Sequence, residues 1–226
     1  MSIRPPTPRV RTRTPGQGAA AAWPGARGGA LAGIVGPLLL GGSILVLTLR
    51  QGEFLRSLGW HPLRAPTVDW PSGLALSPDG AWMIGAFLGS GALLAIFAAG
   101  LHQQLAATGR SPLGPLPLGV AGFALALLAA KTDPTYLPTP RTLAGAIHDG
   151  AYVLLGVSLL PGMLLLAVDL RGRAGWRGHS LLTLLTIALA APAFVLKGAA
   201  FYLFLAVVIG WFLATAGRLW RQRAAP

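Results

Sequence analysis

Long apolar stretches separated by short polar connections dominate this chain of 226 residues. A helix needs about 20 apolar residues to cross a hydrocarbon core of about 30 Å. Three stretches fit this requirement, residues 28–49, 80–101 and 146–168, and a fourth, residues 114–130, is short and has Pro115 and Pro117 at its start. None shows the alternation of apolar and polar positions that membrane barrel strands need. The pattern therefore predicts membrane-spanning helices.

The last apolar stretch, residues 181–217, is too long for one span. As a single helix it would measure about 55 Å, well beyond the membrane core. It is interrupted by Lys197 and Gly198, and a lysine at mid-membrane costs about 2.5–3.5 kcal/mol. A tight turn at Lys197 removes both difficulties and gives two spans, 180–196 and 199–217. We therefore expect an all-α polytopic membrane protein with a six-helix bundle.

Composition agrees with this class. The chain is 54% hydrophobic and 11% charged, whereas a soluble domain is about a quarter charged. There is no cysteine, which rules out disulfides and thiolate metal sites. The formal charge of +12 does not indicate nucleic-acid binding, because its excess lies in segments where sorting of positive charge to the cytoplasm explains it.

The distribution of Lys and Arg predicts the orientation. With both termini in the cytoplasm, the cytoplasmic segments hold Arg4, Arg9, Arg11, Arg13, Arg27, Arg110, Arg171, Arg173, Arg177, Arg218, Arg221 and Arg223. The outer segments hold Arg50, Arg56, Arg64, Lys131, Arg141 and Lys197. We expect a disordered basic tail over residues 1–26, a membrane domain over 27–217 and a second basic tail over 218–226. The arginine clusters would contact anionic lipid of the inner leaflet, and a cell membrane such as the bacterial inner membrane is the expected location.

The first outer loop, residues 50–79, is unusually long for a connection between bundled helices. It holds enough apolar residues to dock on the membrane domain. We expect a short interfacial helix followed by an extended lid, in which Trp60 and Trp70 take part and beside which Trp82 anchors the second span at the interface. The lid would be either a plug at the membrane surface or part of a functional site.

Polar chemistry is concentrated on the same side. Five of the six acidic residues fall in or beside the outer segments: Glu53, Asp69, Asp79, Asp133 and Asp149. Two histidines join them, His61 and His148. Asp149 near a helix start is favourable against the helix dipole, and His148 should face the bundle interior or a wet cavity.

One hypothesis combines His61, Asp69, Asp133 and His148 into a single site. Imidazoles and carboxylates are acceptable ligands for zinc or iron, with an open position for a water nucleophile. His61, Asp133 and His148 are then the catalytic candidates. Each ligand comes from a different segment, however, and a structural hydrogen-bond cluster between helices explains the same residues without any metal.

Two further features have structural interpretations. Gly85 and Gly89 are spaced four apart on the second span, with Gly91 close by, which favours close approach of a neighbouring helix. Lys197 should extend to the outer surface, with a counter-ion role to Asp133 or Asp149 as the alternative. His102 and His179, at cytoplasmic helix ends, are expected to be solvated.

Several loop motifs resemble those of an uncharacterised prokaryotic membrane family, domain of unknown function 998 (DUF998). The matching runs are Leu58-Gly59-Trp60-His61-Pro62-Leu63-Arg64, Asp69-Trp70-Pro71-Ser72-Gly73, Thr132-Asp133-Pro134 and Ile147-His148-Asp149-Gly150. The resemblance extends over most of the chain from about residue 28. It implies six helices, and it carries no assigned activity.

Three functions remain open from the sequence. The leading one is a non-enzymatic membrane protein that interacts with lipid or with a membrane-protein partner through its outer face, without a cofactor. The alternative is a membrane-embedded hydrolase of lipid that uses a divalent metal such as zinc. A small-solute transporter ranks third, because the spans between 28 and 130 hold almost no polar residues that could line a water-filled path.

Overall fold

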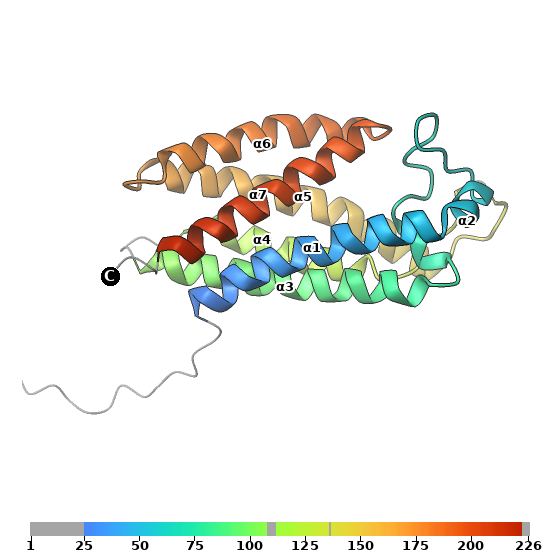
Figure 1. Cartoon of the computed structure of the whole chain (residues 1–226), viewed down its shortest axis with the longest axis horizontal. Coiled ribbons are helices and arrows are strands. Elements are labelled where there is room, and N and C mark those ends of the chain that lie inside the picture. The colour runs from blue at the N-terminus through green and yellow to red at the C-terminus, as the bar shows by residue number, and fades with distance from the viewer. Residues whose placement is uncertain (1–24, 108–111, 136, 223–226) are drawn as a thin grey trace, which may run out of the picture.

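The apolar stretches of the sequence form long helices in the computed structural model, which describes residues 25–107, 112–135 and 137–222 (Figure 1). Among these residues, five helices are long and apolar enough to cross a membrane: α1 (Ala26–Arg50), α3 (Gly80–Ala106), α5 (Leu143–Arg171), α6 (Arg177–Leu196) and α7 (Ala200–Gln222). The all-α membrane class is confirmed. The basic tail predicted over residues 1–26 lies outside the described residues, apart from its last two.

A further apolar helix, α4 (Pro115–Leu127), is shorter than the span predicted over 114–130. Its 13 residues rise about 20 Å, less than the membrane core of about 30 Å. Pro115 and Pro117 occupy its start, where the missing N–H would have no helical partner. The chain leaves the helix in a turn after Leu127. Among the described residues, five helices thus have membrane length, and the sixth apolar helix, α4, is shorter than the span predicted for it.

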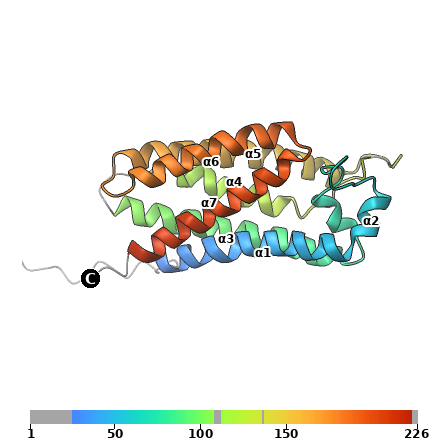
Figure 2. The ribbon, with the colours of Figure 1, turned by 45° about the horizontal axis from the view of Figure 1, so that its top comes forward.

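The six apolar helices pack as a ring. α1 packs against α3, α3 against α4, α4 against α5, α5 against α6, α6 against α7, and α7 returns to α1. Both views of the ribbon show α7 running obliquely across α1 (Figures 1 and 2). The ring is therefore closed by the first and last helices of the chain.

The predicted turn at Lys197 is confirmed. α6 ends at Leu196 and α7 begins at Ala200, and the residues between them include Lys197 and Gly198 at φ values of 53° and 56°. Glycine adopts this region readily, whereas for lysine it is uncommon. The reversal turns the long apolar stretch into two helices that each match the thickness of a membrane.

The long first loop contains two short helices, α2 (Gly52–Ser57) and η1 (Ser72–Leu76). The short helix predicted at the start of this loop is therefore present. Leu55, Leu74 and Ala75 of these helices are buried. The loop docks on the bundle, as its apolar content predicted.

Close helix approach occurs at glycines other than the predicted pair. A Cβ atom at Gly85 would meet nothing within 4 Å, and one at Gly89 would meet only the end of the Leu39 side chain. At Gly91, by contrast, it would lie 2.5 Å from the carbonyl oxygen of Gly122 on α4. The packing role predicted for Gly85 is wrong, because this residue faces open space. Gly91 lies on the face that α4 covers, and the sequence spacing alone does not tell the two faces apart.

Replacing Gly91 by alanine should destabilise the protein by about 1–3 kcal/mol, since the added methyl group overlaps the backbone of α4. Gly85→Ala is the matched control on the same helix. It should leave the melting temperature unchanged or slightly raised, because alanine favours a helix more than glycine does. Thermal unfolding of wild type and both variants in the same detergent measures the change in melting temperature caused by each substitution. Equal losses would contradict this assignment of helix faces.

Candidate functional site

The candidate site lies at the end of the bundle that carries the long first loop, residues 51–79, and the connection from α4 to α5, residues 128–142. We call these two segments the cap. Figures 1 and 2 show α2 and the α4–α5 connection at this end. A hydrogen bond from the backbone N–H of Gly198 to the hydroxyl of Thr67, 3.2 Å long, brings the α6–α7 turn to the same place.

Asp69 ties the two segments of the cap together. Its carboxylate is buried and accepts the backbone N–H of Thr135 at 3.0 Å and 3.1 Å to its two oxygens, together with the Thr135 hydroxyl. Asp69 also has a φ of 49°, a conformation that aspartate tolerates better than most residues. The carboxylate thus accepts hydrogen bonds from the other cap segment.

The tryptophans predicted to form a lid are held by hydrogen bonds from their indole N–H groups. Trp60 donates to the carbonyl of Pro66 at 3.1 Å within the cap. Trp70 donates to the Thr48 hydroxyl on α1 at 2.9 Å. Trp82 remains 44% exposed on α3 and donates to Ser43 on α1 at 3.1 Å. Trp60 and Trp70 are buried, so the first loop is packed on the bundle and does not project from it.

The cap is also attached at its edges. Asp79, at the start of α3, accepts the Gln51 amide at 2.6 Å and pairs with Arg50 at 3.2 Å. The phenolic hydroxyl of Tyr202 on α7 donates to the carbonyl of Pro62 at 3.3 Å. The first loop thus contacts the end of α1, the start of α3 and the start of α7.

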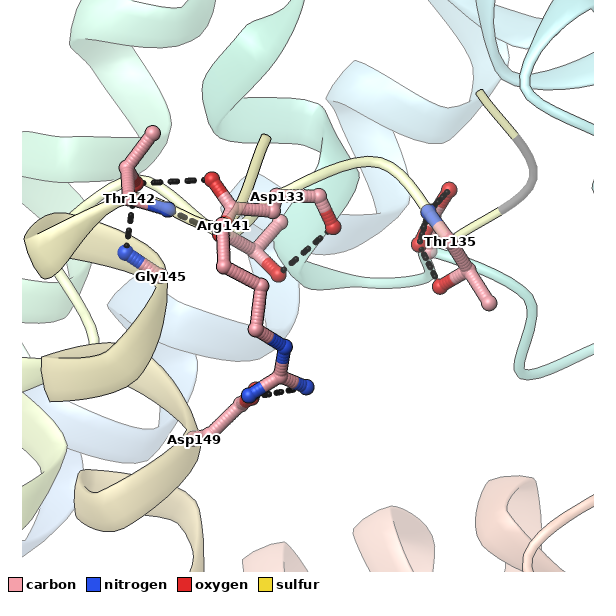
Figure 3. Close-up of polar contacts among 8 residues, drawn as sticks. Asp133, Thr135, Arg141, Thr142, Gly145 and Asp149 are labelled. Carbon is pink, nitrogen blue, oxygen red and sulfur yellow. Dashed lines mark hydrogen bonds and ion pairs between the residues drawn. The ribbon is translucent and has the colours of Figure 1, made fainter. Parts of the chain in front are cut away.

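Asp133 caps the start of α5 (Figure 3). Its carboxylate accepts the backbone N–H of Thr142 at 2.9 Å and the Thr142 hydroxyl at 2.7 Å, while the Thr142 hydroxyl accepts the N–H of Gly145 at 3.0 Å. A Cβ atom at Gly145 would collide with the Asp133 carboxylate, so glycine is needed there. The bonds from the Thr142 backbone and side chain, with a smaller contribution from the Arg141 charge, hold the pKa of Asp133 below its ordinary value of 3.8.

His148 caps the end of α4. It is buried on the first turns of α5, and its Nδ1 lies 3.0 Å from the carbonyl oxygen of Leu128 and 2.8 Å from that of Ala130. A nitrogen between two acceptors must carry the proton, so Nδ1–H donates to both. These carbonyls belong to the helix end, where no intrahelical donor is available. The prediction that His148 faces the bundle is confirmed.

The other polar candidates lie at the surface. His61 is exposed and pairs with Ala65 only through backbone hydrogen bonds. Asp149 forms an exposed ion pair with Arg141 at 3.3 Å (Figure 3). Lys197 is exposed and its ammonium lies 5.0 Å from the centre of the Tyr152 ring, and no ion pair to an acid is found for it among the described residues.

The four residues of the metal hypothesis do not form one group. Within the described ranges, no three His, Cys, Asp or Glu residues are placed so that they could hold a metal ion together. Asp69 binds Thr135, Asp133 binds Thr142, His148 binds the end of α4, and His61 points to the surface. The geometry of these residues is that of hydrogen-bonded connections between segments.

Two features escaped sequence reasoning, and the first is a buried polar network between α6 and α7. His179 was expected to be solvated, but it is buried and its Nε2 lies 2.9 Å from the Thr215 hydroxyl. Trp211 donates its indole N–H to Thr183 at 2.9 Å. Thr183 follows His179 by four residues and Thr215 follows Trp211 by four. This spacing is a weak signal, because a helical threonine also bonds to its own backbone.

The second feature is an apolar crevice inside the ring, with a volume of about 80 Å³. It is lined by five of the helices, and its walls include Gly36, Leu94, Leu125, Leu159, Leu205 and Val208. Its one polar side chain, Ser90, donates to the carbonyl of Gly36 at 3.0 Å. The crevice therefore offers an apolar ligand a surface without unsatisfied polar groups.

The model of a family described as a protein of unknown function, DUF998, matches residues 53–221. No curated protein and no solved structure matches the chain. The family match covers the cap from residue 53 onward and every long helix except α1, up to residue 221 of α7.

Replacing Asp133 by asparagine should lower the melting temperature by a few degrees at neutral pH, because the start of α5 loses a charged acceptor. A carboxyl with a lowered folded-state pKa stabilises the fold above its unfolded-state pKa, here 3.8, and loses this contribution as pH falls through the lower value. The difference in melting temperature between wild type and Asp133→Asn should persist at mildly acidic pH and disappear in strong acid. Calorimetry over a pH series measures it.

Asp149→Asn is the control, since an exposed ion pair contributes little. A difference between wild type and Asp133→Asn that persisted in strong acid would contradict the role given to the ionised carboxylate.

Proposed function

This chain belongs to the DUF998 family of proteins of unknown function, and we propose that it is a non-enzymatic membrane protein that holds the hydrocarbon chain of a lipid inside its helix ring. The proposal rests on one observation above others. Five of the six apolar helices line a crevice whose single polar side chain already has a hydrogen-bond partner.

The chemistry of the crevice favours hydrocarbon as its ligand. A headgroup would need donors or acceptors in the wall, because burying an unpaired polar group costs free energy. Acyl chains surround a membrane protein in large excess, and the crevice lies among residues in the middle of the long helices, such as Leu94 and Leu159. A volume of about 80 Å³ accommodates a short length of chain, with the rest of the lipid outside the crevice.

The state of the cap residues supports a role without catalysis. A catalytic carboxylate or imidazole must reach the substrate within hydrogen-bond distance. Asp69, Asp133 and His148 are instead engaged by backbone groups of the cap. Their partners are backbone groups at helix ends and in loops, which need hydrogen bonds from side chains because they have none from regular structure.

We further propose six membrane crossings with both termini in the cytoplasm. The α1–α3, α4–α5 and α6–α7 connections are joined by hydrogen bonds, so every second connection lies at one end, as a six-crossing path requires. At the other end, Arg171, Arg177 and Arg221 are exposed. Positive charge of this kind favours the cytoplasmic side and anionic lipid there. The inner membrane of a bacterium would suit this arrangement.

Labelling of single thiols tests the crossing of α4, and the absence of native cysteine makes the experiment simple. Leu113 and Thr139 flank α4 and are both exposed. With an impermeant maleimide on intact cells, Thr139→Cys should react, and Leu113→Cys should react only after permeabilisation. Reaction of both on the same side would show that α4 does not cross, and the reverse pattern would invert the orientation.

Native mass spectrometry tests the lipid site. Leu205 lines the crevice, whereas Leu203 on the same helix is 44% exposed on the outside of the bundle. Leu205→Trp should lower phospholipid affinity about tenfold, since overfilling a packed site costs about 1–3 kcal/mol. Leu203→Trp, a matched increase in volume, should leave bound lipid unchanged. Equal lipid retention by both variants, each folded as judged by gel filtration, would overturn the proposal.

A further inference from the structure

The contact between α1 and α7 changes along its length. Away from the cap the two helices approach closely: a Cβ atom at Gly33 would lie 2.9 Å from the Ala216 side chain, and one at Gly41 would lie 2.9 Å from that of Ile209. Because α7 crosses α1 obliquely (Figures 1 and 2), the helices separate on the cap side of this contact. On that side Leu49 of α1 is 77% exposed.

Trp70 of the cap lies between the separated parts of the two helices. Its indole N–H donates to Thr48 on α1, and its ring meets the rings of Tyr202 and Phe201 on α7 at 4.9 Å and 6.4 Å between centroids. Trp70 is only 8% exposed. A loop side chain thus joins the two helices where they no longer touch each other closely.

A chain of ring contacts connects Trp70 to the wall of the crevice. Phe201, which contacts Trp70, packs at 5.2 Å against Phe204, and Phe204 is part of the crevice wall. Farther from the cap, Pro37 and Leu40 of α1 line the crevice together with residues of α7. Trp70 therefore lies on the cap side of the crevice, one ring contact away from a residue that packs on its wall.

The first loop, not a membrane helix, holds Trp70 in this position. The neighbouring Asp69 is fixed by Thr135 of the second cap segment, and its carbonyl accepts the N–H of Gly73 at 2.5 Å. On α1 the tryptophan makes one hydrogen bond, to Thr48. Moving the side chain aside leaves the backbone bonds of α1 and α7 intact, so the seam between these helices can open without unfolding them.

We propose that a phospholipid chain from the cap-side leaflet enters the crevice through the seam between α1 and α7, and that Trp70 is the plug that closes this entry. The proposal rests on the lipid site proposed above and adds its route and its gate. The ligand is a membrane phospholipid whose chain passes Trp70 while its headgroup stays at the membrane surface.

The test measures how fast lipid reaches the crevice. The full chain is reconstituted in phosphatidylcholine vesicles, and a phosphatidylcholine with a photoreactive diazirine on its acyl chain is added to the cap-side leaflet alone. Cross-links to crevice residues are then mapped over time by mass spectrometry. Trp70→Ala should shorten the half-time of cross-link formation at the crevice about tenfold. The variant lacks one hydrogen bond and two ring contacts that keep the seam between α1 and α7 closed. Final occupancy should stay near that of wild type.

Trp82→Ala is the control, because the indole N–H of Trp82 also donates to α1, at Ser43, but from α3 and not from the side of α7. It should load at the wild-type rate. A second variant closes the seam covalently. Thiols introduced by Thr48→Cys and Tyr202→Cys replace two of the groups that contact Trp70. They are the only cysteines of the variant and are joined by a cleavable bismaleimide. Loading should stop when the bridge is closed and resume when it is cleaved.

The outcomes separate the two proposals. Crevice cross-links that form at the same rate in wild type, Trp70→Ala and the bridged variant would overturn entry through this seam and leave the lipid site standing. Cross-links that never reach crevice residues in any variant would overturn the lipid site, and the entry route with it.

Discussion

The packing of α7 on α1 is the contact on which the rest of the structure depends, because it joins the two ends of the chain and closes the ring of helices. Without it, the walls contributed by α1 and α7 would face lipid, and the crevice would be an open groove. The contact is close because Gly33 and Gly41 present no side chain to α7. In a membrane, where burial of apolar surface gives little advantage between helices, such small residues allow dispersion forces to hold a pair together.

The polar residues at the cap end meet a second requirement, which is that backbone groups at helix ends find partners close to lipid. Asp133 accepts a backbone N–H at the start of α5, and His148 donates to a carbonyl at the end of α4. Asp69 bonds to the backbone N–H of Thr135 in a connection that has no regular structure of its own. Two of the acids at this end of the molecule, Asp69 and Asp133, thus bond to the irregular connection between α4 and α5.

The sequence predicts the helices well, because the thickness of a membrane and the cost of a buried lysine leave few alternatives around residue 197. It also predicts that His148 faces inward. It does not predict which face of α3 meets α4, since Gly85 and Gly91 are chemically equivalent until a neighbour is placed beside them. It also misses the burial of His179, the partners of the cap acids and the crevice. Each of these depends on contacts between residues far apart in the chain, which hydropathy does not encode.

One consequence concerns the order in which the protein is made. The carbonyl oxygens of Leu128 and Ala130, at the end of α4, are bonded by a histidine that belongs to the following helix. During synthesis α4 emerges first, so these acceptors have no such partner until the next apolar segment arrives beside them. A helix of 13 residues that relies on its successor in this way is not an independent unit of membrane insertion. The smallest self-sufficient unit at this point of the chain is the hairpin of α4 and α5.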